Sequence, residues 1–193
     1  MQKNRLEAFS DGVFAIIITI MVLEIKAPAG GEMSDLMKLW PVFLSYIMSF
    51  VFLAIYWNNH HHMIHATNRV SGGVLWANTH LLFWLSLVPV MTAWMGEHHF
   101  TPLTVGVYGA VLLLSVVAYK VLQENIIKQE GRDSAFARTL GKDVKGKLSL
   151  ISYAIAIVLS PFSSATSLAI YLVVAAMWFV PDRRMERILP GAE

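Results

Sequence analysis

The sequence predicts an all-α integral membrane protein with six transmembrane helices and both termini in the cytoplasm. The first observation is composition: of 193 residues, 56% are hydrophobic and only 15% are charged, with a mean hydropathy of +0.56. A soluble domain carries about 25% charged residues, so this chain could not solvate its surface. The second is that the apolar residues are collected into long runs. The third is that the basic residues gather at alternate ends of these runs. The length predicts one domain, residues 1–193.

Composition also excludes several classes of protein. The chain has no cysteine, which excludes disulfide frameworks, cysteine zinc sites, iron–sulfur clusters and thiol nucleophiles. The net charge of +2 is too small to indicate nucleic-acid binding. No nucleic-acid partner is expected, and the high hydropathy makes the lipid bilayer the expected surrounding.

Six apolar segments are candidates for crossing the membrane. A spanning helix needs about 17–25 mostly apolar residues, because the hydrocarbon core is about 30 Å thick. The segments cover 9–25, 39–57, 74–95, 103–122, 148–159 and 165–180. The helices that contain them are expected at about 5–26, 38–60, 73–95, 102–125, 145–160 and 164–182.

The last two segments are short, and the residues between them predict a turn. Pro161 lies among serines, and proline interrupts a helix while serine favours turns. A tight helical hairpin is expected, and a re-entrant hairpin remains the alternative. In the third segment Pro89 predicts a kink. The polar stretch 123–147 is interpreted as helix extensions around a cytosolic loop, with breaks at Gly131 and Gly141.

The distribution of Lys and Arg sets the orientation, because loops rich in these residues stay in the cytoplasm. With six crossings and both termini inside, 13 basic residues lie inside and 2 outside. The inside residues are Lys3, Arg5, Arg69, Lys120, Lys128, Arg132, Arg138, Lys142, Lys145, Lys147, Arg183, Arg184 and Arg187. The outside residues are Lys26 and Lys38. Five crossings would put the last three arginines outside.

The first segment differs from the others in its polar start and in one face. Gly12, Ile16, Thr19, Ile20 and Leu23 share a helical face, which carries the only hydroxyl of the span after Ser10. An ordinary packing stripe, with the threonine bonded to its own helix, remains an equal interpretation.

The charged start of that segment lies at or just inside the cytoplasmic interface. Arg5 and Asp11 must there be paired or reach water. Asp11 is favoured by the helix N-terminal dipole, and a cap or interface anchor is at least as good an interpretation as an ion contact.

Histidines are concentrated at the end of the second segment. Trp57 is followed by His60, His61 and His62, and His65 lies one helical turn after His61. Histidines at i and i+4 can hold a metal. No acidic residue is near them in the sequence, so we favour a structural or pH-responsive cluster over a metal site.

Two functions and one sequence motif suggested by these observations are considered next. A proton-coupled secondary transporter needs an ionisable residue near the midplane, but Asp11 and Glu24 lie at opposite ends of the first helix. A histidine-based metalloprotein would need a carboxylate or general base. The stretch 104–109 looks like a potassium-channel filter but lies within a continuous apolar segment, so Gly106 and Gly109 are interpreted as sites of close helix approach.

The chain resembles the transmembrane protein 175 family, the endosomal and lysosomal potassium channels of animals and their prokaryotic homologues. An R-x-x-x-F-S-D motif opens the first helix as Arg5, Phe9, Ser10 and Asp11. Trp57 with His60 and His61 is similar to the end of the family's second helix, and Asn78 with Pro89 and Thr92 to its third.

This resemblance implies a potassium-permeable, modestly selective channel of a prokaryotic plasma membrane, and no enzyme. Homotetramers would place the first helices around a central pore, with Ile16 as a hydrophobic constriction followed by Ile20 and Leu23. Potassium ions would pass near Ile16 and Thr19, with no cofactor and no tightly bound metal. The residues expected to fix the first helix are Arg5, Phe9, Ser10, Asp11, Trp57 and either or both of His60 and His61.

Overall fold

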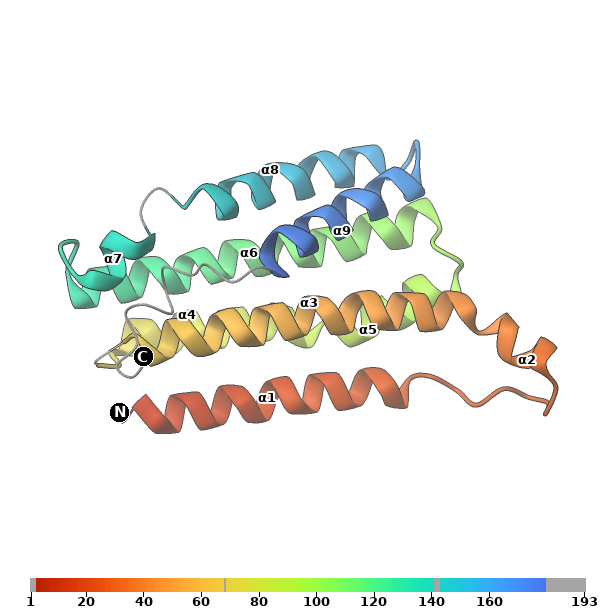
Figure 1. Ribbon diagram of the computed structural model, residues 1–193, viewed down its shortest axis with the longest axis horizontal. Helices are drawn as coiled ribbons and strands as arrows, with labels where there is room; N and C mark the ends of the chain where they lie inside the picture. The colour runs from red at the N-terminus through yellow and green to blue at the C-terminus, as the bar shows by residue number, and fades with distance from the viewer. Residues whose placement is uncertain (1–2, 68, 141–142, 180–193) are drawn as a thin grey trace.

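The computed structural model describes residues 3–67, 69–140 and 143–179, and the regular structure within these ranges is helical (Figure 1). The helices are α1 (Lys3–Leu23), α2 (Met33–Lys38), α3 (Trp40–His65), α4 (Gly72–Ser86), α5 (Val88–Glu97), α6 (Pro102–Glu130), α7 (Ala135–Leu140), α8 (Val144–Leu159) and α9 (Ser164–Phe179). The expected end of the sixth segment, Gly141, Lys142 and the arginines at 183, 184 and 187 lie outside the described residues.

The long helices lie side by side in one bundle with two distinct ends (Figure 1). The start of α1, the α3–α4 connection and α7 gather at one end, while α2 and the α5–α6 and α8–α9 connections lie at the other. Helix α6 packs against α4, α5, α8 and α9, whereas α1 lies at the edge of the bundle against α3, α4 and α5. One flank of α1 therefore has no neighbour within residues 3–67, 69–140 and 143–179.

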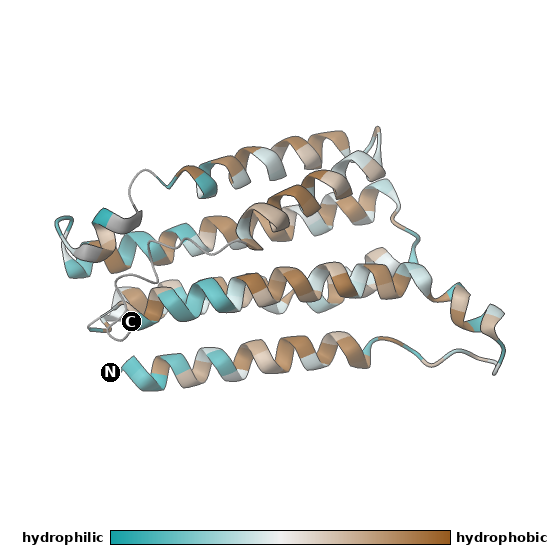
Figure 2. Cartoon of the chain, in the orientation of Figure 1, coloured by the Kyte–Doolittle hydropathy of each residue, from teal (hydrophilic) through white to brown (hydrophobic). Residues whose placement is uncertain are grey.

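Among the described residues, four helical stretches are long and apolar enough to cross a membrane. They are Lys3–Leu23, Trp40–His65, Gly72–Glu97 and Pro102–Glu130. Helices α8 and α9 have 16 residues each, a length of about 24 Å at the usual helical rise. Figure 2 shows hydrophobic residues along the middle of the bundle and hydrophilic residues at the N-terminal end of α1 and the C-terminal end of α3.

Several boundaries differ from those that hydropathy predicts. Helix α3 continues to His65, because polar residues can extend a helix beyond its apolar span. The third segment is divided at Leu87, two residues before Pro89, so the expected kink is an interruption between α4 and α5. The short helix α2 lies in a connection for which no helix was expected.

Close approach of the helices explains the glycines of α6. A Cβ on Gly109 would collide with the Tyr171 hydroxyl, and a Cβ on Gly106 would lie 2.7 Å from the Ser160 hydroxyl oxygen. The expected role of these glycines is confirmed. Gly131 ends α6 with a φ of 97°, where glycine is favoured.

The turn after α8 is tight, as the proline and serines predict. The Phe162 amide donates to the Leu159 carbonyl at 2.9 Å, and α9 begins at Ser164. Within the hairpin the Ser167 hydroxyl donates to the Ala156 carbonyl at 2.7 Å. Whether this hairpin crosses the membrane stays a prediction.

Candidate functional site: an exposed helix face with a polar anchor

Helix α1 has one buried side, which packs against α3, α4 and α5. The buried residues recur every three or four positions, as expected for one helical stripe. They are Leu6, Ser10, Phe14, Ile17 and Met21. These side chains fix the rotation of α1 about its axis and so determine which residues point away from the bundle.

The side of α1 that points away from the bundle contains the face found in the sequence. Ile16 is 60% exposed and Leu23 is 74% exposed, and Ile20 is 41% exposed. Gly12 and Thr19 are exposed too. All five residues of the predicted face are therefore directed away from the chain's own core. They remain available to lipid or to further copies.

Thr19 lies within this face and bonds to its own helix. Its hydroxyl donates to the Ala15 carbonyl at 2.7 Å. A hydroxyl that donates its single proton keeps oxygen lone pairs that can accept. The threonine oxygen can therefore still offer a partial negative charge to a cation beside the exposed face.

The polar start of α1 is attached to α3 by a tryptophan–aspartate pair. The Trp57 indole N–H donates to Asp11 Oδ1 at 2.9 Å. A hydrogen bond to a carboxylate is stronger than one between neutral groups. The structure thus brings together two of the residues that the sequence placed in one network.

A second, buried connection runs from α3 through α4 to α1. His60 Nε2 lies 2.7 Å from Asn78 Oδ1, the Asn78 amide donates to Ser10 Oγ at 3.0 Å, and Ser10 donates to the Leu6 carbonyl at 2.9 Å. The acceptor role of Asn78 Oδ1 makes His60 Nε2 the donor. His60 is 1% exposed, so a broken link would leave unpaired polar groups in the interior.

A third connection involves a residue that sequence reasoning missed. His61 Nδ1 lies 3.2 Å from Glu7 Oε1. Glu7 precedes Asp11 by one helical turn, and this i, i+4 spacing was the available signal. Both His60 and His61 therefore reach α1, the first through Asn78 and the second directly.

Arg5 and Phe9 are placed differently from the rest of the expected network. Both are exposed, Phe9 at 57%. Within the described ranges Arg5 makes no hydrogen bond or ion pair. The structure of one chain therefore does not join Arg5 to the Asp11–Trp57 pair.

The middle of the bundle behind α1 is held by hydroxyl groups. Ser49 Oγ lies 2.9 Å from the Tyr108 hydroxyl, and the Thr92 hydroxyl lies 2.6 Å from Ser49 Oγ. These contacts link α3, α5 and α6. They leave the opposite, exposed face of α1 untouched.

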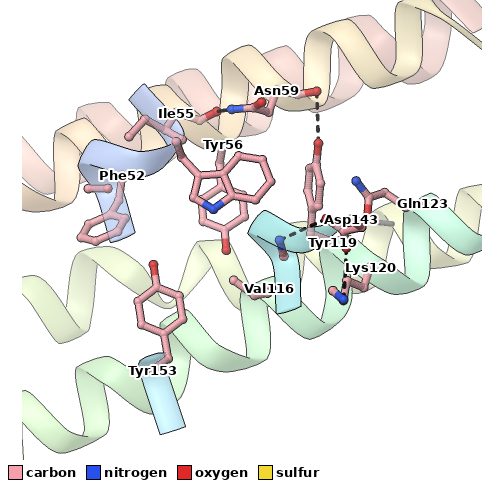
Figure 3. A pocket seen from close by; sticks show the side chains of 13 residues that line it. Phe52, Ile55, Tyr56, Asn59, Val116, Tyr119, Lys120, Gln123, Asp143 and Tyr153 are labelled. Carbon is pink, nitrogen blue, oxygen red and sulfur yellow. Dashed lines mark hydrogen bonds and ion pairs between the residues drawn. The ribbon is translucent and has the colours of Figure 1, made fainter. Parts of the chain in front are cut away.

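A separate pocket lies among α3, α6, α8 and α9 (Figure 3), and no residue of α1 lines it. Tyr56, Tyr119 and Tyr153 line it, and the Tyr56 hydroxyl has no hydrogen-bond partner in the described part of the chain. Lys120 and Asp143 form an ion pair at 3.1 Å beside it. None of the residues predicted for the site lines this pocket.

Comparison with known proteins identifies the class. The model of the family described as "Endosomal/lysosomal potassium channel TMEM175" matches residues 5–89. A potassium channel of Chryseobacterium sp. (strain P1-3) is 47% identical over 189 residues, which cover 98% of each chain. An endosomal/lysosomal proton channel TMEM175 of Bos taurus is 28% identical over 193 residues, which cover 86% of this chain and 40% of the relative.

A solved structure supports the same assignment. The crystal structure of a lysosomal potassium-selective channel TMEM175 homolog from Chamaesiphon minutus matches with a TM-score of 0.81 and 28% identity. The match covers 93% of this chain and 97% of that chain. The fold and the motif-bearing α1 thus define an ion channel of the membrane and not an enzyme. The chain belongs to the TMEM175 family, which confirms the resemblance of its sequence.

Proposed function

We propose that this protein is a potassium-permeable, modestly selective cation channel whose conduction path is lined by the exposed face of α1. The observation that carries the proposal is that Gly12, Ile16, Thr19, Ile20 and Leu23 are all exposed, on the side of α1 that contacts no other described part of the chain. The names of the bacterial relatives as potassium channels support the choice of ion.

Several copies are needed for this path, since one chain offers only one helix face. Closed rotational symmetry would place equivalent α1 faces around an axis. We propose a homotetramer, the assembly that the family resemblance implies. Its four copies of Ile16 would form the narrowest ring, with Ile20 and Leu23 further along the pore.

The proposed orientation has six crossings, both termini in the cytoplasm and a prokaryotic plasma membrane as the location. Basic residues support it: Lys3, Arg5 and Arg69 belong to the start of α1 and the α3–α4 connection, whereas Lys26 and Lys38 belong to the opposite end of the bundle. Helices α8 and α9 would be the short fifth and sixth crossings, accommodated by local thinning of the bilayer.

The chemistry of the face predicts how ions pass. A ring of branched aliphatic side chains excludes hydrated ions when narrow, by dewetting, and conducts when it widens. The Thr19 oxygen would accept a partly dehydrated potassium ion near the Ile16 ring. Such a path needs no resident cofactor and lacks a rigid oxygen cage, so we expect modest selectivity for potassium over sodium and poor passage of divalent ions.

The direct test uses purified protein in planar bilayers, with single-channel recording in asymmetric potassium and sodium. Wild type should pass potassium passively. Ile16→Asn should raise conductance and reduce selectivity, because an amide wets the constriction. Ile155→Asn on α8, at a site 49% exposed, is the matched control and should leave conductance unchanged. Equal conductance and selectivity in wild type and Ile16→Asn would contradict the proposal.

Proton conduction is a second candidate, because the Bos taurus relative is named a proton channel. The same liposomes under a pH gradient and without potassium test it. Proton current alone would favour this candidate. Saturable potassium flux driven by the proton gradient would instead favour a coupled transporter, although α1 carries no ionisable side chain from Gly12 to Leu23.

A further inference from the structure

We infer that Glu7, His61 and His65 form a binding site for a divalent transition metal ion such as Zn²⁺, which would link α1 to α3. Each of the three side chains offers one ligand atom, and these atoms lie within 4.8 Å of one another. Two imidazoles and one carboxylate are a ligand set that zinc accepts. The inference concerns the polar end of α1 and is independent of which ion the channel conducts.

The local geometry is close to that of a loaded site. Two ligand atoms at about 2.0–2.1 Å from a tetrahedral zinc ion lie about 3.3 Å apart. His61 Nδ1 and Glu7 Oε1 are already 3.2 Å apart. The His61 and His65 rings are stacked at a centroid distance of 5.8 Å on consecutive turns of α3. A small rotation of the exposed His65 side chain would therefore complete a three-ligand set.

The site is open to an ion from the surrounding water. The His61 side chain is 40% exposed and the Glu7 side chain 21% exposed, so the remaining coordination position would take water. Lys3 lies nearby, but its ammonium group donates to the backbone carbonyl of His65. Among the described residues it makes no ion pair with Glu7.

The arrangement also supplies the acidic ligand that the sequence near the histidines lacks. Histidines on α3 alone lacked an acidic partner, and Glu7 supplies it from a different helix. A bound ion would therefore bridge two helices. It would tie the start of the helix bearing the exposed face to α3, beside the Trp57–Asp11 pair.

The test measures Zn²⁺ binding by equilibrium dialysis with full-length, tag-free protein in detergent. Wild type should bind one ion per chain. Glu7→Gln keeps a hydrogen-bond acceptor for His61 but loses the charge. This variant and His65→Ala should each weaken binding more than about tenfold. His98→Ala, in an exposed histidine at the opposite end of the bundle, is the matched control and should bind as wild type.

Hydrogen exchange gives a second readout that does not depend on conduction. Saturating Zn²⁺ should slow exchange of amides in the first turns of α1 in wild type and in His98→Ala, but not in Glu7→Gln or His65→Ala. Equal zinc affinity in all four proteins, or no saturable binding, would overturn the inference. Binding that leaves exchange in α1 unchanged would overturn the bridging of the two helices.

Discussion

Helix α1 and the α8–α9 hairpin both present exposed aliphatic residues, but they are attached to the bundle in different ways. Ile16 and Leu23 on α1 are as exposed as Ile155 and Val173 on the hairpin. Helix α1 is held at its polar end by side-chain contacts, including the Trp57–Asp11 pair. The hairpin is held by Ser160 and Tyr171, whose side chains pack against the glycines of α6, and the Tyr171 hydroxyl donates to the Val105 carbonyl at 3.1 Å.

This difference shows that exposure of apolar side chains alone does not separate a pore face from a lipid face. In a bilayer, both kinds of face are apolar and lack neighbours in the chain. The feature that separates α1 from the hairpin is the Thr19 hydroxyl in the middle of its exposed stripe. The hairpin has an exposed lysine at Lys147 and an exposed hydroxyl at Thr166, but these lie in the first turns of α8 and α9. Its exposed positions further along, at 155, 158, 172 and 173, carry no hydroxyl.

Single cysteine substitutions should show the largest difference between the α1 face and the hairpin face. The sequence has no cysteine of its own, so any crosslink would come from the introduced one. In membranes treated with a mild oxidant, Leu23→Cys should form a covalent dimer, since equivalent α1 helices would surround one axis. Val173→Cys, at a site 68% exposed, should stay monomeric on non-reducing gels. Dimers from Val173→Cys alone would reverse the assignment of the two faces.

Alanine substitutions at two glycines distinguish a position packed between helices from a position on the proposed pore face. Gly109→Ala should destabilise the protein by about 1–3 kcal/mol, because Tyr171 would be displaced. Gly12→Ala should not destabilise it, because no atom of the described residues lies within 4 Å of the added methyl group. Thermal unfolding in detergent measures both. We expect the Gly12 variant instead to alter potassium conductance, and wild-type conductance would argue that Gly12 faces lipid.

The buried connection at the start of α1 can be broken at Asn78. Asn78→Leu would leave Ser10 and His60 without their partner, at a cost of about 1–3 kcal/mol for unpaired buried groups. The midpoint of thermal unfolding should fall. Thr79→Val is the neighbouring control, because the Thr79 hydroxyl donates within its own helix, to the Leu75 carbonyl, and to no other helix that the structure describes. Equal midpoints for the two variants would mean that this connection does not anchor α1.

The smallest effect is expected at the hydrogen bond between Trp57 and Asp11. Trp57→Phe removes the indole donor to Asp11 and should cost about 0.5–1.5 kcal/mol, the usual net value of one hydrogen bond. Trp40→Phe, at the other end of α3, removes an exposed indole that has no such bond among the described residues. Differential scanning calorimetry should place the Trp57 variant below the Trp40 variant, and the reverse order would contradict the anchor.

The sequence allowed prediction of the helices and the α1 face, because both depend on local spacing. The order of apolar runs locates the long helices, and i, i+3 and i, i+4 spacing groups Ile16 with Thr19 and Leu23. Hydropathy could not tell which side of α1 is buried, since every side is apolar. That side depends on contacts with α3, α4 and α5.

The polar contacts at the start of α1 were only partly predictable, because they too depend on which helices meet. Trp57 and Asp11 were grouped through the family motif, whereas the contact of Glu7 with His61 requires two helices far apart in the sequence to meet. The short α2 was missed because it does not alter the hydropathy of its segment. At Pro89 the predicted kink is an interruption at Leu87, because the proline has no amide hydrogen to continue the helical hydrogen bonds.

Accessibility of position 16 to water tests the proposed conduction path most directly. Ile16→Cys channels in planar bilayers would be treated with a charged, water-soluble thiol reagent during potassium current recording, with Ile155→Cys as the control. We predict that the reagent blocks current through Ile16→Cys and leaves Ile155→Cys unchanged. Unaltered Ile16→Cys current, together with a thiol shown by mass spectrometry to be unmodified, would place this side chain outside the pore.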